Sequence, residues 1–271
     1  MPELPEVETT RRGLEQSLVG YRLVDLDVRE ARFRWPVELP ANALIGQTLR
    51  TIERRAKYLL LRFDHGVLIL HLGMSGHLRV VAADAELRPH DHIDFAFADD
   101  RILRFNDPRR FGSVHWCDAN VYDHPLLRHL GVEPLGEAFT GDLLYQSSRK
   151  RQVAVKNFIM ASDVVVGVGN IYANESLFQA GIRPTRPAGA IARARYQRLA
   201  EAIKSTLQRA IDAGGTTLRD FVGFDGKPGY FALELDVYGR AGEPCLACDR
   251  KLKGIVLGQR QTVYCPQCQR Y

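Results

Sequence analysis

Four cysteines near the end of the chain have the spacing of a metal site. They are Cys245, Cys248, Cys265 and Cys268, so that 16 residues separate two C-x2-C pairs. Paired thiolates at this separation are typical of a structural zinc site with tetrahedral geometry. Two disulfides are the alternative, which the reducing cytoplasm disfavours. We expect one structural zinc ion per chain, with no open coordination position for a catalytic water.

The first eight residues, MPELPEVE, combine two prolines with three glutamates. Pro5 suits the first position of a helix, and Glu6 and Glu8 suit its first turn, where the helix dipole favours negative charge. An apolar stripe with helical spacing then continues to about residue 20. This helix explains the sequence from Pro5 onward, but it leaves Pro2 and Glu3 without a role.

The charge of the chain is distributed unevenly. Residues 1–148 contain 18 Lys and Arg against 22 Asp and Glu, whereas residues 149–271 contain 19 against 10. A basic second half favours a surface that binds a polyanion, although a solvated basic surface is the alternative. No segment has the apolar length of a membrane span, and the acidic N-terminus is unlike the basic start of a signal peptide. We expect a cytoplasmic protein.

The elements that position these residues change character along the chain. Residues 23–28 alternate apolar and charged side chains, and residues 58–72 and 93–105 form two hairpins that turn at residues 64–66 and 99–100. Consecutive hairpins predict antiparallel sheet, and we expect a β-sandwich with the first helix packed on it.

The later part of the chain has helical patterns instead. Leu199, Ile203, Leu207 and Ile211 share one helix face, which ends at two glycines, residues 214–215. The predicted fold class is therefore α+β: an N-terminal β-sandwich domain over residues 1–130, a helical domain over 131–236, and a zinc finger over 237–271.

Eight segments together resemble one family, the bacterial formamidopyrimidine-DNA glycosylases, which excise oxidised purines. These segments are PELPEVE, RRAKYLLL, HLGMSG, NDPRRFG, GVGNIYANESLFQAGIRP, GGTTLRDF, DGKPGYF and QRQTVYCPQC. They occur in one order over nearly the whole chain. The resemblance implies a monomeric, bifunctional DNA glycosylase and abasic-site lyase that removes 8-oxoguanine and formamidopyrimidines from double-stranded DNA. It also implies a helix–two-turn–helix in the second domain.

The resemblance also assigns the catalytic residues. Removal of the methionine ahead of a small residue would leave Pro2 with a free secondary amine. An α-amino group has a pKa of about 7.7–8.0, against about 10.4 for lysine, so it is far more often unprotonated near neutrality. In the family this amine attacks the damaged nucleotide, forms an iminium and leads to β,δ-elimination. Glu3 is implied as general acid or base, Glu6 as a second carboxylate, and Lys57 and Arg260 as phosphate-binding groups of the active site.

A second set of residues is implied to contact DNA. Met74 and Phe111 match a wedge that fills the space of an extruded base, and Arg109 matches the residue that engages the orphaned cytosine. Residue type alone favours core positions for Met74 and Phe111. The loop over residues 224–230 is expected to close over the extruded base. Further backbone contacts are implied at His90, Arg151, Lys156 and Asn170.

Two other functions remain open at this stage. An enzyme of the endonuclease VIII type would share the proline nucleophile and prefer oxidised pyrimidines, but Leu4 and the PRRFG segment favour the purine enzyme. A non-catalytic zinc-finger DNA-binding protein would keep the finger without the chemistry, and the retained Pro2, Glu3, Lys57 and Arg260 disfavour it. His90 and His92 could also form a weak metal site, although the sequence offers no evident third ligand.

Overall fold

The computed structural model describes residues 2–215 and 235–270. These residues form two compact units: unit 1 contains residues 2–128 and 213–215, and unit 2 contains residues 129–212 and 235–270. In the part of the chain that is described, no helix is both long and apolar enough to span a membrane. The expected lesion loop at residues 224–230 lies outside the described residues. The domain limits 1–130, 131–236 and 237–271 stay predictions.

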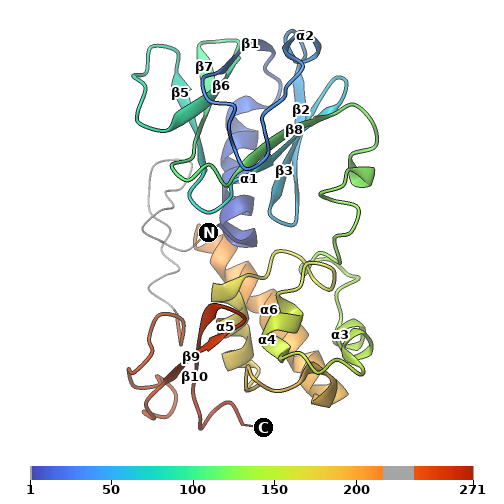
Figure 1. The fold of residues 1–271 in the computed structure, drawn as a ribbon, viewed down its shortest axis with the longest axis vertical. Coiled ribbons are helices and arrows are strands. Elements are labelled where there is room, and N and C mark those ends of the chain that lie inside the picture. The colour runs from blue at the N-terminus through green and yellow to red at the C-terminus, as the bar shows by residue number, and fades with distance from the viewer. Residues whose placement is uncertain (1, 216–234, 271) are drawn as a thin grey trace. The chain divides into compact units, whose positions relative to one another are not determined.

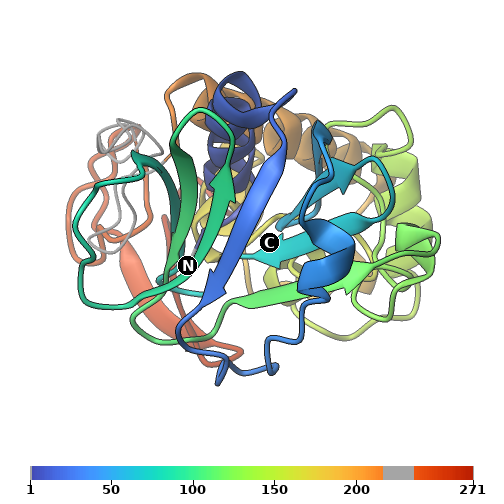
Figure 2. The ribbon, with the colours of Figure 1, turned by 90° about the horizontal axis from the view of Figure 1, so that it is seen from above.

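Unit 1 contains a β-sandwich of two antiparallel four-stranded sheets, as the hairpin pattern predicts (Figures 1 and 2). The strand orders are β1–β6–β7–β5 and β2–β3–β4–β8. One continuous apolar core contains residues from both sheets. The strands are β1 (Leu23–Val28), β2 (Leu49–Arg55), β3 (Tyr58–Phe63), β4 (Val67–His71), β5 (His77–Ala82), β6 (Asp91–Phe97), β7 (Arg101–Asn106) and β8 (Ser113–Cys117).

The first helix, α1 (Leu4–Leu18), packs on this sandwich (Figure 1). The structure thereby confirms the expectation that the first helix packs on the sheets. It contacts β2 and β3 of one sheet and β5 of the other. Val7, Leu14 and Leu18 join the apolar core, where burial of each such side chain contributes about 1.5–3 kcal/mol. The helix is thereby held against both sheets, and its N-terminal turn is held with it. Unit 1 also contains the short helix α2 (Ala41–Leu44) and the 3-10 turn η1 (Val121–Asp123).

Unit 2 is helical with a terminal hairpin. The stripe of α6 that the sequence predicts is buried, because α6 packs against both α3 and α5. Thr140 caps α3 by accepting the backbone N–H of Leu143 at 3.1 Å. Asn170 is the first residue of α5 and follows a Gly-rich turn. The elements are α3 (Gly141–Ser148), α4 (Val155–Ile159), α5 (Asn170–Gln179), η2 (Ala188–Ala190), α6 (Arg193–Asp212), β9 (Lys253–Leu257) and β10 (Arg260–Tyr264).

Candidate active site

The N-terminal group consists of Pro2, Glu3 and Glu6. Glu3 precedes α1 in extended backbone, with φ −103° and ψ −169°, and its side chain accepts the backbone N–H of Glu6. In return, Glu6 Oε2 accepts the backbone N–H of Glu3 at 2.7 Å. This reciprocal capping box satisfies two donors that the start of a helix otherwise leaves without partners. Glu3 is 3% exposed and Glu6 is 0% exposed, so neither is a solvated terminal charge.

Glu6 fixes the peptide that joins Pro2 to Glu3. The N–H that Glu6 accepts belongs to this peptide, and Pro2 itself is buried. A hydrogen bond from a buried amide to a carboxylate contributes about 1.5–3 kcal/mol. Gly215 lies against the same side chain, since a Cβ atom at residue 215 would stand 3.3 Å from Glu6 Cγ and Oε1. Glu6 therefore restricts the position of the Pro2 nitrogen.

Lys57 lies in the two-residue turn between β2 and β3, after Ala56, which has a positive φ of 55°. Along the neighbouring helix, Arg11 Nη1 donates to the Ile52 carbonyl at 3.1 Å, and Glu8 pairs with Arg54 at 3.2 Å. The Glu8–Arg54 pair lies nearer to the N-terminus of α1, and nearer to the end of β2, than the Arg11–Ile52 contact does. The turn that carries Lys57 and the N-terminal group therefore lie at the same end of unit 1.

His71 is a neighbour of Lys57 that the sequence did not single out. Its ring lies 4.8 Å from the Tyr58 ring, and its Nδ1 accepts the backbone N–H of Gly73 at 3.1 Å. Burial, together with the nearby charges of Lys57 and Arg34, lowers the pKa of His71 from 6.5 to about 4. The imidazole is therefore neutral near pH 7, with its proton on Nε2.

The residues predicted to form a DNA wedge are exposed. Met74 is 37% exposed and Phe111 is 44% exposed, so the alternative of core positions does not hold. The Arg109 guanidinium lies over the Phe111 ring, 4.8 Å from its centroid. The two loops that carry these residues touch through their backbones, because a Cβ atom on Gly73 would overlap the backbone of Phe111 and Gly112. The structure thus brings Met74, Arg109 and Phe111 together.

His90 is exposed and has a positive φ of 73°. The His92 ring lies 6.1 Å away, but His92 Nε2 is hydrogen-bonded to the Asp107 carbonyl at 3.0 Å. Among the described residues, the one group of three or more side chains placed to hold a metal ion is the four-cysteine cluster. The histidine pair is therefore not a metal site in the described structure.

The environment of Lys156 differs from that expected of a side chain that contacts a phosphate. Its side chain is fully buried in unit 2, and its ammonium donates to three protein acceptors. These are Asn170 Oδ1 at 2.6 Å, the Gln261 carbonyl at 3.1 Å and Thr262 Oγ1 at 2.7 Å. An ammonium has three protons to donate, so these acceptors use all of them. The described structure thus places the Lys156 ammonium on protein acceptors of Asn170 and the β9–β10 hairpin, and its predicted phosphate contact stays a prediction.

The other basic candidates of unit 2 are exposed. Arg260 is the first residue of β10 and lines a cavity of about 210 Å³ together with Asn157, Met160, Ala161 and Gly258. Its guanidinium is accessible to a phosphate. Arg151 lies 4.0 Å from Asp163 and 5.5 Å from the centroid of the Phe158 ring. This long ion pair is exposed, and it holds Arg151 weakly.

The four cysteines form the metal cluster that their spacing predicts. Their Sγ atoms all lie within 4.8 Å of one another, and three pairs are 3.5–4.0 Å apart. A tetrahedral zinc site with Zn–S bonds of about 2.3 Å requires S···S separations of about 3.8 Å. The residues therefore fit one structural zinc ion. Four thiolates complete its coordination, so the ion has no position for a catalytic water. The cluster is Cys245, Cys248, Cys265 and Cys268.

Two residues of α5 attach this finger to the helices, and sequence reasoning missed both. Asn174 Oδ1 accepts the backbone N–H of Val263 at 2.8 Å. The Glu175 carboxylate accepts three successive backbone N–H groups, those of residues 236, 237 and 238, at 2.8–3.0 Å. Burial raises the pKa of Glu175, although the three amide donors act in the opposite direction. The available signal was an adjacent Asn-Glu pair in the middle of a helix, between the mostly apolar segments IYA and SLF.

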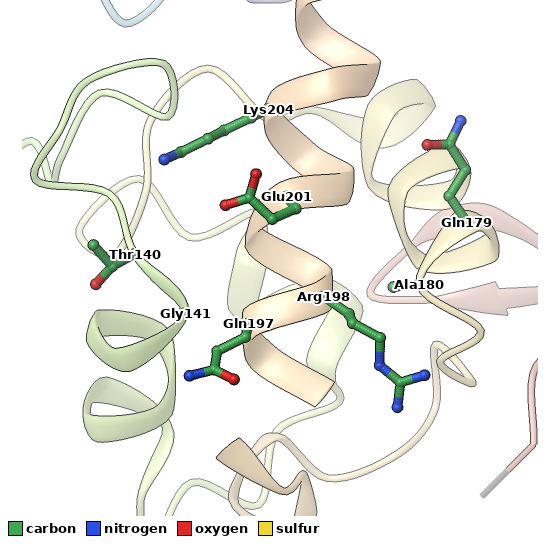
Figure 3. A pocket seen from close by; sticks show the side chains of 8 residues that line it. All are labelled: Thr140, Gly141, Gln179, Ala180, Gln197, Arg198, Glu201 and Lys204. Carbon is green, nitrogen blue, oxygen red and sulfur yellow. The ribbon is translucent and has the colours of Figure 1, made fainter. Parts of the chain in front are cut away.

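A larger cavity of about 440 Å³ lies in unit 2 beside α6. Figure 3 shows that its side chains diverge: Gln197, Glu201 and Lys204 point toward the side of Thr140, whereas Arg198 points away from them. None of its lining residues is a predicted site residue. This cavity offers no convergent group of polar atoms, and we do not assign it to the active site.

Comparison with known proteins finds three family matches in succession along the chain. Residues 1–114 match the formamidopyrimidine-DNA glycosylase N-terminal domain, and residues 130–222 match the H2TH domain of these enzymes. Residues 242–270 match a zinc finger found in FPG and IleRS. The fold and the site thus define a zinc-containing DNA glycosylase.

The similarity to known proteins extends over the full or nearly full length of both chains. The formamidopyrimidine-DNA glycosylases of Alkalilimnicola ehrlichii and Thioalkalivibrio sulfidiphilus are each 58% identical to this chain, with 100% of both chains covered. The Lactococcus lactis Fpg in complex with DNA containing an abasic site is 34% identical, with a TM-score of 0.92, over 99% of this chain and 100% of that one. The MutM (FPG) protein of Thermus thermophilus is 37% identical, with a TM-score of 0.89, over 99% and 98%. The chain belongs to the formamidopyrimidine-DNA glycosylase family.

Proposed function

We propose that this enzyme excises oxidised purines, with 8-oxoguanine opposite cytosine as the leading substrate, and then cleaves the strand at the abasic site. The observation that carries the proposal is the N-terminal group, in which two buried carboxylates surround the peptide of Pro2. Burial of two carboxylates at a chain terminus costs free energy. An amine nucleophile beside them gives this pair a role in catalysis. The similarity to enzymes solved with lesion-containing DNA supports the same conclusion.

The proposed chemistry begins with the Pro2 amine. After loss of Met1, its nitrogen lone pair attacks the anomeric carbon, the C–N bond to the damaged base breaks, and the base leaves with a proton. The nitrogen then loses its proton to Glu3, and its lone pair forms a C=N bond as the C1′–O4′ bond of the sugar breaks and O4′ takes a proton to become a hydroxyl. The resulting iminium acidifies the neighbouring sugar proton, whose loss expels the 3′ phosphate, and a second elimination expels the 5′ phosphate. The nearby start of α1 disfavours the ammonium form of the amine, because the positive end of the helix dipole lies there.

Glu3 and Glu6 take different roles in this proposal. Glu3 adjoins the nucleophile and transfers protons, as general acid and then general base. Glu6 positions the amine by holding the Glu3 N–H. Glutamine substitutions separate the two roles, because a glutamine oxygen can still accept the same backbone N–H. Glu3→Gln should abolish base excision while lesion DNA still binds, and Glu6→Gln should reduce excision less than tenfold. A loss of about a hundredfold or more in Glu6→Gln would instead assign proton transfer to Glu6.

DNA binding in the proposal uses exposed and partly exposed side chains of both units. Met74 and Phe111 fill the space of the extruded nucleotide, and Arg109 engages the orphaned cytosine. The phosphate backbone of the DNA is contacted by His90, Lys57, Arg151, Asn170 and Arg260. Lys156 orients Asn170 from within the protein, since it donates to Asn170 Oδ1. The amide nitrogen of Asn170, which is the group that can donate to a phosphate, is then on the opposite branch of that side chain.

The decisive experiment is trapping of the iminium with borohydride on an 8-oxoguanine duplex. Protein with a native Pro2 terminus should form the cross-link, and protein with an intact N-terminal tag should not, because a tag converts the amine into an amide. A C-terminal tag is the matched control. A cross-link from N-terminally tagged protein, confirmed intact by mass, would remove the Pro2 mechanism. Excision measured on 8-oxoguanine and on thymine glycol duplexes separates the purine enzyme from an endonuclease VIII-like preference for pyrimidines.

A further inference from the structure

Asp107 occupies a buried position between three loops that carry the proposed DNA contacts of unit 1. It follows β7 in the segment NDPRRFG and has 0% exposure. The first loop, residues 72–76, carries Met74, and the second, residues 83–90, carries His90. The third, residues 107–112, carries Arg109 and Phe111. No apolar contact explains why a carboxylate is buried at this place, so its hydrogen bonds must do so.

The Asp107 carboxylate connects the first loop to the third. Ser75 Oγ donates to Asp107 Oδ1 at 2.7 Å, and the backbone N–H of Gly112 donates to Asp107 Oδ2 at 2.8 Å. Ser75 Oγ in turn accepts the backbone N–H of Arg109 at 3.2 Å. Each wedge residue is thus one residue away from an atom in this network: Met74 precedes Ser75, and Phe111 precedes Gly112.

The Asp107 backbone connects the second loop to the same point. Its N–H donates to the His90 carbonyl at 3.1 Å, and its carbonyl accepts from Arg110 N–H at 3.1 Å and from His92 Nε2 at 3.0 Å. His90 and Arg110 both have positive φ values, 73° and 53°, which non-glycine residues adopt at a cost. These hydrogen bonds therefore hold backbone conformations that the two residues would not prefer by themselves.

We propose that Asp107 is a positioning residue that holds Met74, His90, Arg109 and Phe111 in one fixed arrangement before DNA binds. The inference rests on the proposed function, because it assigns a purpose to these four side chains. Asp107 lies out of reach of solvent and contacts no substrate; it acts through the loops. A wedge that is ordered in advance loses less conformational entropy when it enters the duplex. Its position also matters, because displacement of a binding group by about 1 Å can reduce a rate by about a hundredfold.

The test compares two substrates that need the wedge to different extents. Asp107→Ala should reduce single-turnover excision from an 8-oxoguanine duplex by about ten- to a hundredfold. Cleavage of a pre-formed abasic site in a flexible single strand, which requires no unstacking, should change less than about threefold by the same reasoning. Ser75→Ala removes one link and should show a smaller loss of the same kind. Asp107→Asn should recover part of the activity, because its amide oxygen can still accept the Gly112 N–H while its nitrogen donates to Ser75.

Two controls separate positioning from general destabilisation. Leu23→Ala removes a fully buried core side chain on β1, outside the three loops. It should lower stability without separating the two substrates. In a Met74→Ala, Arg109→Ala, Phe111→Ala background, Asp107→Ala should cause a much smaller further loss than in the unmodified protein, since three of the four side chains it positions are gone.

Equal losses on both substrates, or full additivity in that background, would overturn the inference. Full duplex activity in a folded Asp107→Ala protein would overturn it as well. Failure of the proposed function has a different signature: the unmodified protein would then form no borohydride cross-link on either substrate.

Discussion

The buried ammonium of Lys156 allows the sharpest distinction between the interpretation from the sequence and that from the structure. We consider Lys156→Met, which keeps most of the length of the side chain and removes the charge. In unit 2 this leaves Asn170 Oδ1, the Gln261 carbonyl and Thr262 Oγ1 without the donor that they share. Hydrogen bonds to a charged group contribute about 1.5–3 kcal/mol each, and they are not additive within one cluster.

Full burial of Lys156 means that solvent neither screens these bonds nor replaces them. We therefore expect Lys156→Met to lower the free energy of unfolding of unit 2 by about 3 kcal/mol, which corresponds to roughly two of the three bonds. The β9–β10 hairpin should separate from α4 and α5 more easily, and zinc should be released faster to a chelator. Urea unfolding followed by circular dichroism, and zinc release followed with a colorimetric chelator, measure the two effects.

The salt dependence of DNA binding decides between the two roles. A lysine that contacts a phosphate contributes about 0.9 to the slope of log K against log salt concentration, and its removal leaves stability unchanged. We expect the opposite for Lys156→Met: a loss of stability with the slope unchanged. Arg260→Ala is the matched control, since Arg260 is exposed, and it should lower the slope without a loss of stability. A fully stable Lys156→Met protein whose slope falls by about 0.9 would refute the structural interpretation.

Three further predictions address the metal, the wedge and a neutral histidine. Removal of zinc should abolish DNA binding while the β-sandwich stays folded, because so short a finger depends on the metal for its folding energy; full lesion binding by metal-free protein, checked by metal analysis, would contradict this. Arg109→Ala and Phe111→Ala should reduce lesion-duplex processing far more than cleavage of an abasic single strand, and equal reductions would mean that these side chains do not fill the duplex. Because the pKa of His71 is lowered from 6.5 to about 4, its contribution to folding should be complete above pH 6.5 and should disappear as the pH falls toward 4. An NMR titration in which the His71 ring protonates near pH 6.5 would contradict the burial argument.

The sequence by itself determined the elements whose signals are local. The turn at residues 64–66 and the apolar runs on either side of it predict the β3–β4 hairpin, and the apolar stripe of Leu199, Ile203, Leu207 and Ile211 predicts the buried face of α6. The cysteine spacing predicts the metal cluster for the same reason. Periodicity, turn residues and ligand spacing act over a few residues, so they can be read without knowledge of the fold. The resemblance of eight segments added the family, which the comparisons confirm.

Only the tertiary structure decided which polar groups are buried and which partners they have. A glutamate near a chain end is usually solvated, but Glu3 is buried and capped. Lys156 is 106 residues from Thr262 along the chain, and Asp107 is 32 residues from Ser75. No local pattern specifies such pairs, because the desolvation that makes them strong exists only after distant segments have packed together. The sequence therefore predicted the candidate site residues, and the packing of distant segments determined which of their side chains are buried and which are exposed.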